Sequence, residues 1–172
     1  LHNLLSLNLC FNKLTNLPTE LTSPLQNLKE LKLCNNNLDN IGLSPSMINL
    51  VDLDLSGNQL DVLDSDAVLP FSHLNYLSLA RNQLSEIRPT LFQQIPNLMV
   101  LDLSKNRLTS LPKALKSLVN LQTLDISENA VTDIDQDTIG LLTSLWRLQM
   151  NGNLLTRIPE GSFNNLASLQ IL

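Results

Sequence analysis

One eleven-residue phrase, L-x-x-L-x-L-x-x-N-x-L, occurs seven times in this chain and constrains its fold more than any other feature. The copies begin at Leu4, Leu28, Leu50, Leu74, Leu98, Leu121 and Leu145, and an eighth copy opens at Leu169. Successive starts lie 24, 22, 24, 24, 23, 24 and 24 residues apart. A repeat of this period predicts a solenoid, because each unit can bury its apolar face only against its neighbours.

Apolar and polar residues alternate within each phrase, as Leu101 and Leu103 do with Asp102 and Ser104. This period of two predicts a short strand with one buried face, and seven such strands must lie in parallel. Two more apolar sets follow in each unit: Leu17, Ile41, Leu63, Ile87, Leu111, Ile134 and Ile158, and then Leu25, Met47, Phe71, Ile95, Leu118, Leu142 and Leu166. We predict an α/β-type solenoid, with a short-stranded parallel sheet on its concave face and mostly irregular or 3-10 segments on its convex side.

The ninth position of the phrase is Asn in every full copy: Asn12, Asn36, Asn58, Asn82, Asn106, Asn129 and Asn153. The backbone turns inward after each strand and leaves amide and carbonyl groups that need partners. An Asn side chain offers both donors and an acceptor. We interpret the seven as a structural ladder along the solenoid and not as a ligand site.

The segments between the phrases resemble the 24-residue "typical" class of leucine-rich repeats, which continues as L-x-x-L-P-x-x-x-F-x-x-L. The segment LTRIPEGSFNNLASL places Pro159, Phe163 and Leu166 in the expected slots, and Phe92 fills the same slot in an earlier copy. The resemblance covers the whole chain. It implies a horseshoe-shaped protein-binding ectodomain of an animal cell-surface or secreted protein, such as a Toll-like receptor or an adhesion receptor.

Some copies depart from that pattern. Leu21 and Leu115 come one residue early, in LPTEL and LPKAL, and Ile139 replaces the Phe of the sixth copy. The L-P-x-x-L wording also occurs in intracellular repeat proteins. The alternative function is therefore a cytoplasmic scaffold or targeting module attached to a signalling enzyme.

Residues 1–172 are predicted to form one elongated array, and its ends lack the polar or disulfide-bonded caps of a complete solenoid. We therefore expect an uncapped segment of a longer protein. The net charge of -5 argues against nucleic-acid binding. No apolar run approaches the roughly 18 residues of a membrane span, so we expect no direct membrane insertion.

Cys10 and Cys34 occupy the seventh position of the first two copies, where later copies carry small residues. Adjacent parallel strands lie about 4.8 Å apart, which leaves a disulfide open on distance. Parallel stacking directs both Cβ atoms the same way, so two free thiols are the favoured expectation. A zinc site is disfavoured, because two Cys without a matching His give too few ligands.

The sequence gives no support for catalysis or for a cofactor. His2 and His73 lie in no nucleophile motif, and no glycine-rich phosphate loop is present. The run Asp61, Asp64 and Asp66 lacks the Gly and closing Glu of a calcium loop. We predict that the chain is not an enzyme.

The outward-facing positions of the strands are the predicted binding surface, with the third and fifth positions of the phrase at its centre. Large apolar and guanidinium groups there have the composition of interface anchors. The candidate protein-binding residues are Tyr76, Arg81, Met99, Val100, Asp102, Asp125, Trp146 and Arg147. Two alternatives stay open. In the first, Met99 and Trp146 instead fold over the strand edges and pack between coils. In the second, Asp102 and Asp125 occupy a position where Asp is common throughout this family, so they need not indicate a binding site. The expected partner is a protein, with homo- or hetero-association through the array as a further possibility.

Overall fold

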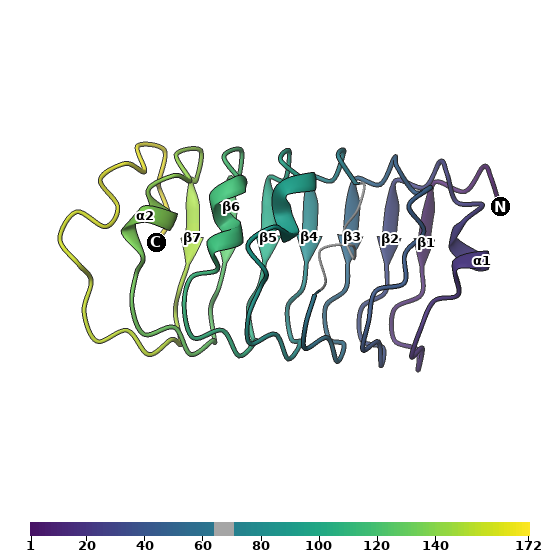
Figure 1. Ribbon diagram of the computed structural model, residues 1–172, viewed down its shortest axis with the longest axis horizontal. Coiled ribbons are helices and arrows are strands. Elements are labelled where there is room, and N and C mark those ends of the chain that lie inside the picture. The colour runs from purple at the N-terminus through teal and green to yellow at the C-terminus, as the bar shows by residue number, and fades with distance from the viewer. Residues whose placement is uncertain (64–70) are drawn as a thin grey trace.

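The computed structural model describes residues 1–63 and 71–172. Seven three-residue strands form one parallel sheet in sequence order, so the chain advances by one strand for every coil (Figure 1). The strands are β1 (Ser6–Asn8), β2 (Glu30–Lys32), β3 (Asp52–Asp54), β4 (Tyr76–Ser78), β5 (Val100–Asp102), β6 (Thr123–Asp125) and β7 (Arg147–Gln149). The predicted parallel solenoid is confirmed.

The strands pair in the register that the repeated phrase predicts. Each strand holds positions three to five of its copy, so the central leucines pair, as Leu53 does with Leu77. Asp102 pairs with Asp125 in the same way. Because side chains alternate along a strand, the central leucine enters the core while positions three and five lie on the opposite face. All of the latter except the buried Ser78 are at least partly exposed.

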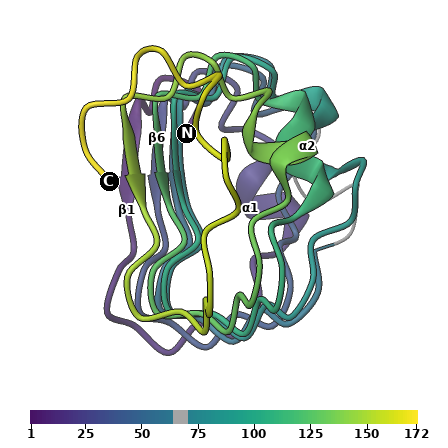
Figure 2. The same cartoon turned by 90° about the vertical axis from the view of Figure 1, so that its left-hand side faces the viewer.

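In the return segments, the described residues form short helical turns, as expected. These are α1 (Thr19–Thr22), η1 (Leu91–Gln94), η2 (Lys113–Ser117) and α2 (Gln136–Ile139), where η marks a 3-10 turn. The end-on view places the sheet on one side of the coil and the α-helices on the opposite side (Figure 2). Asp135 begins α2 because its side chain accepts a hydrogen bond from the Asp137 amide.

A single apolar core runs along the whole array between these two sides. Its largest fully buried side chains are Phe71 and Phe92, and most of the predicted leucines are fully buried with them. The first phrase also contains leucines that are only partly buried, among them Leu4, Leu7 and Leu9. Within the two apolar sets of the return segments, two residues are exceptions: Ile41 is only half-buried, and Ile158 is 60% exposed. Ile158 follows β7, the last named strand, so fewer coils flank it than flank its counterparts.

The predicted asparagine ladder is present. The Asn106 amide nitrogen donates to Leu79 O at 2.9 Å and Leu103 O at 3.0 Å, and Asn106 Oδ1 accepts from the Leu84 amide at 3.0 Å. Each buried asparagine therefore joins its own coil to the preceding one. Asn12 was expected to do the same, but it is exposed and bonds only within its own coil, because no full copy precedes it.

A second ladder, which the sequence analysis missed, follows the residue just before each phrase. The Asn97 amide nitrogen donates to Ser72 O at 3.0 Å, and that of Asn120 donates to Pro96 O at 3.0 Å. Asn27, Asn49 and Ser144 repeat the bond, and His73 Nδ1 lies 3.1 Å from Ile48 O. The available signal was the recurrence of Asn at the position just before the phrase.

The cysteine prediction was wrong, because Cys10 and Cys34 form a disulfide. Their Cα atoms lie 4.5 Å apart, within the range of about 4.4–6.8 Å that disulfides span. Both residues follow their strands at equivalent places on adjacent coils. The shared direction of their Cβ atoms brings the sulfurs side by side, where rotation about χ1 lets them meet.

Candidate functional site

The candidate site is the solvent face of the sheet, hereafter the sheet face, formed by the third and fifth positions of the seven copies. Its third positions are Ser6, Glu30, Asp52, Tyr76, Val100, Thr123 and Arg147, and its fifth positions are Asn8, Lys32, Asp54, Ser78, Asp102, Asp125 and Gln149. Five of these side chains are carboxylates and two are cations, so the sheet face is acidic.

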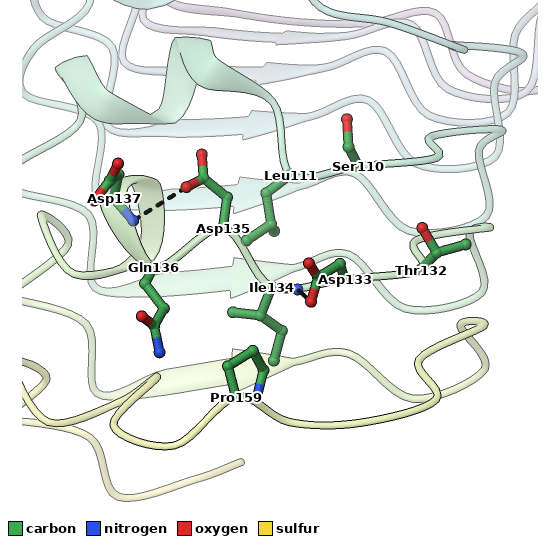
Figure 3. Close-up of a pocket in the computed structure, with 9 residues that line it drawn as sticks. All are labelled: Ser110, Leu111, Thr132, Asp133, Ile134, Asp135, Gln136, Asp137 and Pro159. Carbon is green, nitrogen blue, oxygen red and sulfur yellow. Dashed lines mark hydrogen bonds between the residues drawn. The ribbon is translucent and has the colours of Figure 1, made fainter.

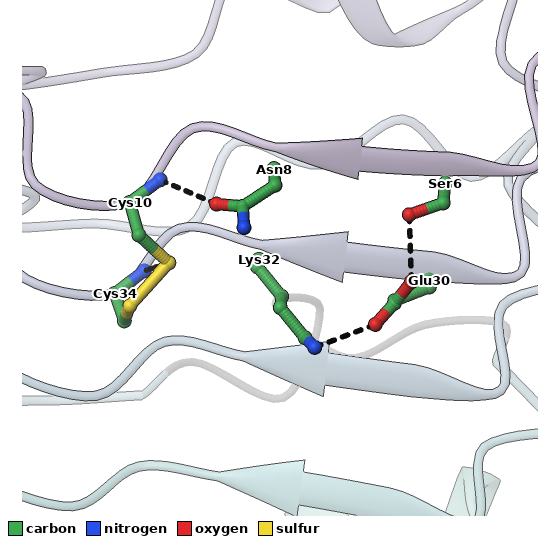
Figure 4. A network of polar contacts seen from close by, with 6 residues as sticks. All are labelled: Ser6, Asn8, Cys10, Glu30, Lys32 and Cys34. Carbon is green, nitrogen blue, oxygen red and sulfur yellow. Dashed lines mark hydrogen bonds and ion pairs between the residues drawn. A yellow bond between two sulfur atoms is a disulfide. The ribbon is translucent and has the colours of Figure 1, made fainter.

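The first two coils hold a connected set of polar groups on the sheet face (Figure 4). Lys32 Nζ lies 2.6 Å from Glu30 Oε1, and Ser6 Oγ donates to Glu30 Oε2 at 2.6 Å. The bond from Lys32 and then that from Ser6 lower the pKa of Glu30, and Glu30 in turn raises the pKa of Lys32. Both groups therefore keep their charges at neutral pH.

Asp52 and Tyr76 pair across β3 and β4 in the middle of the array. Burial raises the pKa of Asp52, with Lys32 opposing this shift and Glu30 and Asp54 adding to it. Burial, followed by the charge of Asp54, raises the pKa of Tyr76. Asp52 Oδ1 is shielded from solvent and has no hydrogen-bond partner, and the same is true of Arg147 Nε on β7.

Asp102 and Asp125 have a structural task that the sequence analysis did not recognise. Asp102 Oδ1 accepts from the Ser104 amide at 2.9 Å, and Asp125 Oδ1 accepts from the Ser127 amide at 2.8 Å. Asp54 bonds the Ser56 amide in the same way. The recurring D-x-S wording was the available signal, since an Asp side chain commonly bonds the amide two residues on. One oxygen of each carboxylate thus supports a turn.

The structure brings together only some of the predicted binding residues. Tyr76 and Val100 are half-buried neighbours on β4 and β5, whereas Arg147 lies on β7 with β6 between. Arg81 is exposed beyond the end of β4, in a left-handed turn with φ of 53°. The candidates therefore spread over four coils and both ends of the strands.

Met99 and Trp146 come just before β5 and β7, at the opposite end of the strands from Arg81. They are 39% and 37% exposed, so neither is packed away between the coils. Met99 lines a groove of about 410 Å³ with Val51, Asn75 and Gln122. Second-ladder residues complete its lining: His73, Asn97, Asn120 and Ser144. The repeat pattern does not predict this groove.

A larger hollow of about 510 Å³ lies among the return segments and contains three carboxylates, Asp133, Asp135 and Asp137 (Figure 3). Asp135 accepts from Thr138 Oγ1 at 2.6 Å and from the Asp137 amide at 3.1 Å, and Asp133 accepts from the Ile134 amide at 2.9 Å. The Thr138 bond lowers the pKa of Asp135. These acids shape the chain around α2 and make no nucleophile–base pair with the other lining residues.

Asp64 and Asp66, part of the acidic run in the sequence, lie outside the described residues, and Asp61 is exposed. No helix within residues 1–63 and 71–172 has the length and apolar character to cross a membrane.

A sequence profile of the leucine rich repeat family matches residues 2–60, 72–131 and 119–172. The chain therefore belongs to the leucine-rich repeat family, whose fold is typically a binding scaffold for proteins. No curated protein matches the sequence.

Three solved structures illustrate the relationship. A leucine-rich repeat protein of Leptospira interrogans is 36% identical with a TM-score of 0.90, over 99% of this chain and 43% of that one. TLR13, in its complex with ssRNA13, is 27% identical with a TM-score of 0.83, over 99% of this chain and 23% of that one. Internalin C2 of Listeria monocytogenes is 26% identical with a TM-score of 0.79, over 97% of this chain and 69% of that one. The chain thus spans less than half of the first two proteins, and the solenoid is common to all.

Proposed function

We propose that this chain recognises a protein partner through its sheet face and has no catalytic activity of its own. The partner contacts the central and C-terminal strands, with Tyr76, Val100 and Arg147 as anchors. Arg81, Met99 and Trp146 contribute at the two ends of the strands.

The observation that carries the proposal is the position of the unsatisfied polar atoms. Buried polar groups in folded proteins nearly always have hydrogen-bond partners. Within the described part of the chain, the two shielded side-chain atoms without a partner are Asp52 Oδ1 and Arg147 Nε, and both belong to the sheet face. A ligand lying across the strands can supply the missing bonds.

The charge of the sheet face indicates the chemistry of that ligand. Five carboxylates against two cations favour a contact region rich in Lys and Arg. Asp102 and Asp125 each keep one carboxylate oxygen beyond the one bonded to the backbone, so they steer such a partner at long range. The TLR13 structure is a complex with single-stranded RNA. An acidic sheet face repels phosphates, which favours a basic protein over RNA for this chain.

We place the protein at the cell surface or outside the cell. The Cys10–Cys34 disulfide supports this location, because disulfides persist mainly in oxidising compartments. The resemblance to receptor ectodomains agrees with it. The absence of a nucleophile–base pair among the described residues of the return-segment hollow supports a binding role without catalysis.

The test is an affinity measurement with matched variants. A partner captured by cross-linking to the folded chain is identified, and its Kd is measured by a biosensor for Tyr76→Ala, Arg147→Glu and the wild type. Loss of a buried interface anchor should weaken binding by roughly 2 kcal/mol or more, which is about thirtyfold. Melting temperature serves as the folding control.

Lys116→Glu on the return side is the matched surface control, because Lys116 is exposed and lies in η2. Unchanged affinity for this variant is expected. If Lys116→Glu abolishes binding while Tyr76→Ala and Arg147→Glu do not, the return side is the interface and the proposal is wrong.

A further inference from the structure

The geometry points to a second, redox-gated property at the N-terminal end of the sheet face: after reduction, Cys10, Cys34 and Asp54 bind one thiophilic divalent cation such as Zn²⁺. The two sulfurs and one carboxylate oxygen all lie within 4.8 Å of one another, and all three residues are partly exposed. This inference is independent of the proposed protein recognition.

The three donors have the chemistry and spacing that such an ion requires. Thiolate and carboxylate ligands bind zinc at about 2.3 and 2.0–2.2 Å, so ligand atoms around a tetrahedral ion stand ~3.5–3.8 Å apart. The separations between the carboxylate oxygen and the sulfurs, at most 4.8 Å, need to close by about one ångström, whereas the two bonded sulfurs must move apart once they are reduced. Three protein ligands leave a fourth position for water, which reaches the site because the residues are not buried.

The backbone holds the three donors on consecutive coils. Leu9 N donates to Lys32 O at 2.8 Å and Leu33 N donates to Asp54 O at 2.8 Å, which ties the ends of β1, β2 and β3 together. The Cys34 amide also donates to Cys10 Sγ at 3.0 Å, a bond that stabilises a thiolate at that sulfur. Asp54 Oδ1 bonds the Ser56 amide at 2.9 Å, so the other carboxylate oxygen is available as the ligand.

Lys32, the cation nearest in sequence to Cys34, is directed elsewhere. Its ammonium lies 2.6 Å from Glu30 Oε1, and the side chain reaches toward Glu30 and away from the sulfurs (Figure 4). Repulsion between Lys32 and a bound cation is therefore moderated by Glu30.

The disulfide makes metal binding conditional on reduction. A dithiol reductant attacks the Cys10–Cys34 bond and leaves as its own disulfide, so that two electrons and two protons arrive at the two protein sulfurs. Metal binding then releases both protons to water as the thiols become thiolates. The same two side chains thus either link the first two coils covalently or link them through an ion to the third.

Titration with Co²⁺, a spectroscopic substitute for Zn²⁺, tests the inference. The protein is reduced with a phosphine, which becomes the phosphine oxide and does not compete for the ion as a dithiol does. We expect a thiolate-to-cobalt charge-transfer band that saturates at one ion per chain and disappears when Zn²⁺ is added. The unreduced protein should show no band.

Asp54→Asn and Asp102→Asn form a matched pair, because both aspartates end a strand and bond the amide two residues on. Asp54→Asn should weaken Co²⁺ affinity by about tenfold or more, as expected for a lost ligand, and Asp102→Asn should leave it unchanged. Cys10→Ser should abolish the band, and this variant should fold because Ser occupies the same position at Ser56, Ser104 and Ser127.

Three results would overturn the inference. The first is the absence of the cobalt charge-transfer band in the reduced wild-type protein, whether or not Zn²⁺ alters its melting temperature. The second is an equal Co²⁺ affinity for Asp54→Asn and Asp102→Asn. The third is saturation of the band at one ion per two chains.

Discussion

At the scale of single residues, the seventh, eighth and ninth positions of the phrase have different structural roles, although they are adjacent in sequence. The ninth position satisfies buried backbone groups, the eighth makes a left-handed turn, and the seventh needs a small side chain. Of these three positions, only the ninth carries the same residue in all seven full copies, so only its role could be predicted from the repeat pattern.

Asn106→Ala tests the ladder at its centre. The change leaves the Leu84 amide without its side-chain partner. Leu79 O and Leu103 O each lose one of two asparagine donors, because Asn82 and Asn129 still donate to them. We expect the free energy of unfolding to fall by about 1–3 kcal/mol, measured by urea denaturation. Asn12→Ala is the control, because Asn12 is exposed and bonds only its own coil. Equal losses for the two variants would contradict an inter-coil role.

Asp52→Asn tests the electrostatics of the sheet face. Burial raises the pKa of Asp52 above its ordinary value of 3.8, so the folded state binds the proton more tightly than the unfolded state. The stability that this carboxyl contributes is complete below about pH 3.8 and declines as the pH rises through the folded-state pKa. The neutral amide should therefore stabilise the protein at pH 7, by less than about 1 kcal/mol because the group is partly exposed.

The measurement is the difference between variant and wild type in urea denaturation across pH. The gain from Asp52→Asn should vanish at low pH, where the wild-type carboxyl is also neutral. A gain that stays constant from acid to neutral pH would show that desolvation of the charge is not its cause.

At the scale of elements, each strand is followed by the same left-handed turn, whatever residue occupies it. Glycine adopts this conformation at Gly57 and Gly152, but larger residues also occupy it, as Arg81 does with φ of 53°. For residues with a Cβ atom this backbone costs about 1–2 kcal/mol. The hydrogen bonds between adjacent coils hold the turn in place, as when Arg81 N donates to Ser104 O at 2.8 Å.

Gly57→Ala and Arg81→Gly test this turn in opposite directions. A Cβ atom at Gly57 would meet Asn35 Oδ1 at 2.5 Å, in addition to the unfavourable φ of 67°. We expect Gly57→Ala to lower the unfolding free energy by about 1–2 kcal/mol. Arg81→Gly should raise it by up to about 1 kcal/mol, reduced by the greater freedom of glycine in the unfolded chain. Thermal melts compare the two, and destabilisation by both would contradict the argument.

At the scale of the whole molecule, each coil contacts only its neighbours, so stability is approximately a sum of local terms. The Cys10–Cys34 disulfide joins the first two coils across a sequence separation of 24 residues. Its contribution should therefore remain at the N-terminal end of the array and fade along the sheet.

Reduction of the disulfide should destabilise the first coils by about 3 kcal/mol, the entropy of closing a loop of this length. Hydrogen exchange is the measurement. The amides of Leu9 and Phe11, which bond β2 and its following turn, should lose protection, whereas Leu103 in the fifth coil should not. A uniform loss along the chain would show that the array unfolds as one cooperative unit. Metal-free buffer separates this effect from ion binding.

The sequence by itself determined the array: the number of strands, their parallel order, their register and the inter-coil role of six asparagines. These follow from a strict period, because residues one period apart meet the same neighbours in every coil. The sequence also indicated which positions face solvent, since alternation along a strand assigns its two faces.

Only the tertiary structure decided the features that belong to one place in the array, because the repeat pattern does not distinguish one coil from another. The disulfide depends on where the Cys10 and Cys34 side chains point, and a parallel pattern does not specify χ1. The unsatisfied Asp52 Oδ1 and Arg147 Nε depend on shielding by neighbouring coils. The proximity of Asp54 to the two cysteines joins three copies of the phrase through space. Each of these features is a relation between coils at one particular place, whereas the repeated phrase records only what all the coils share.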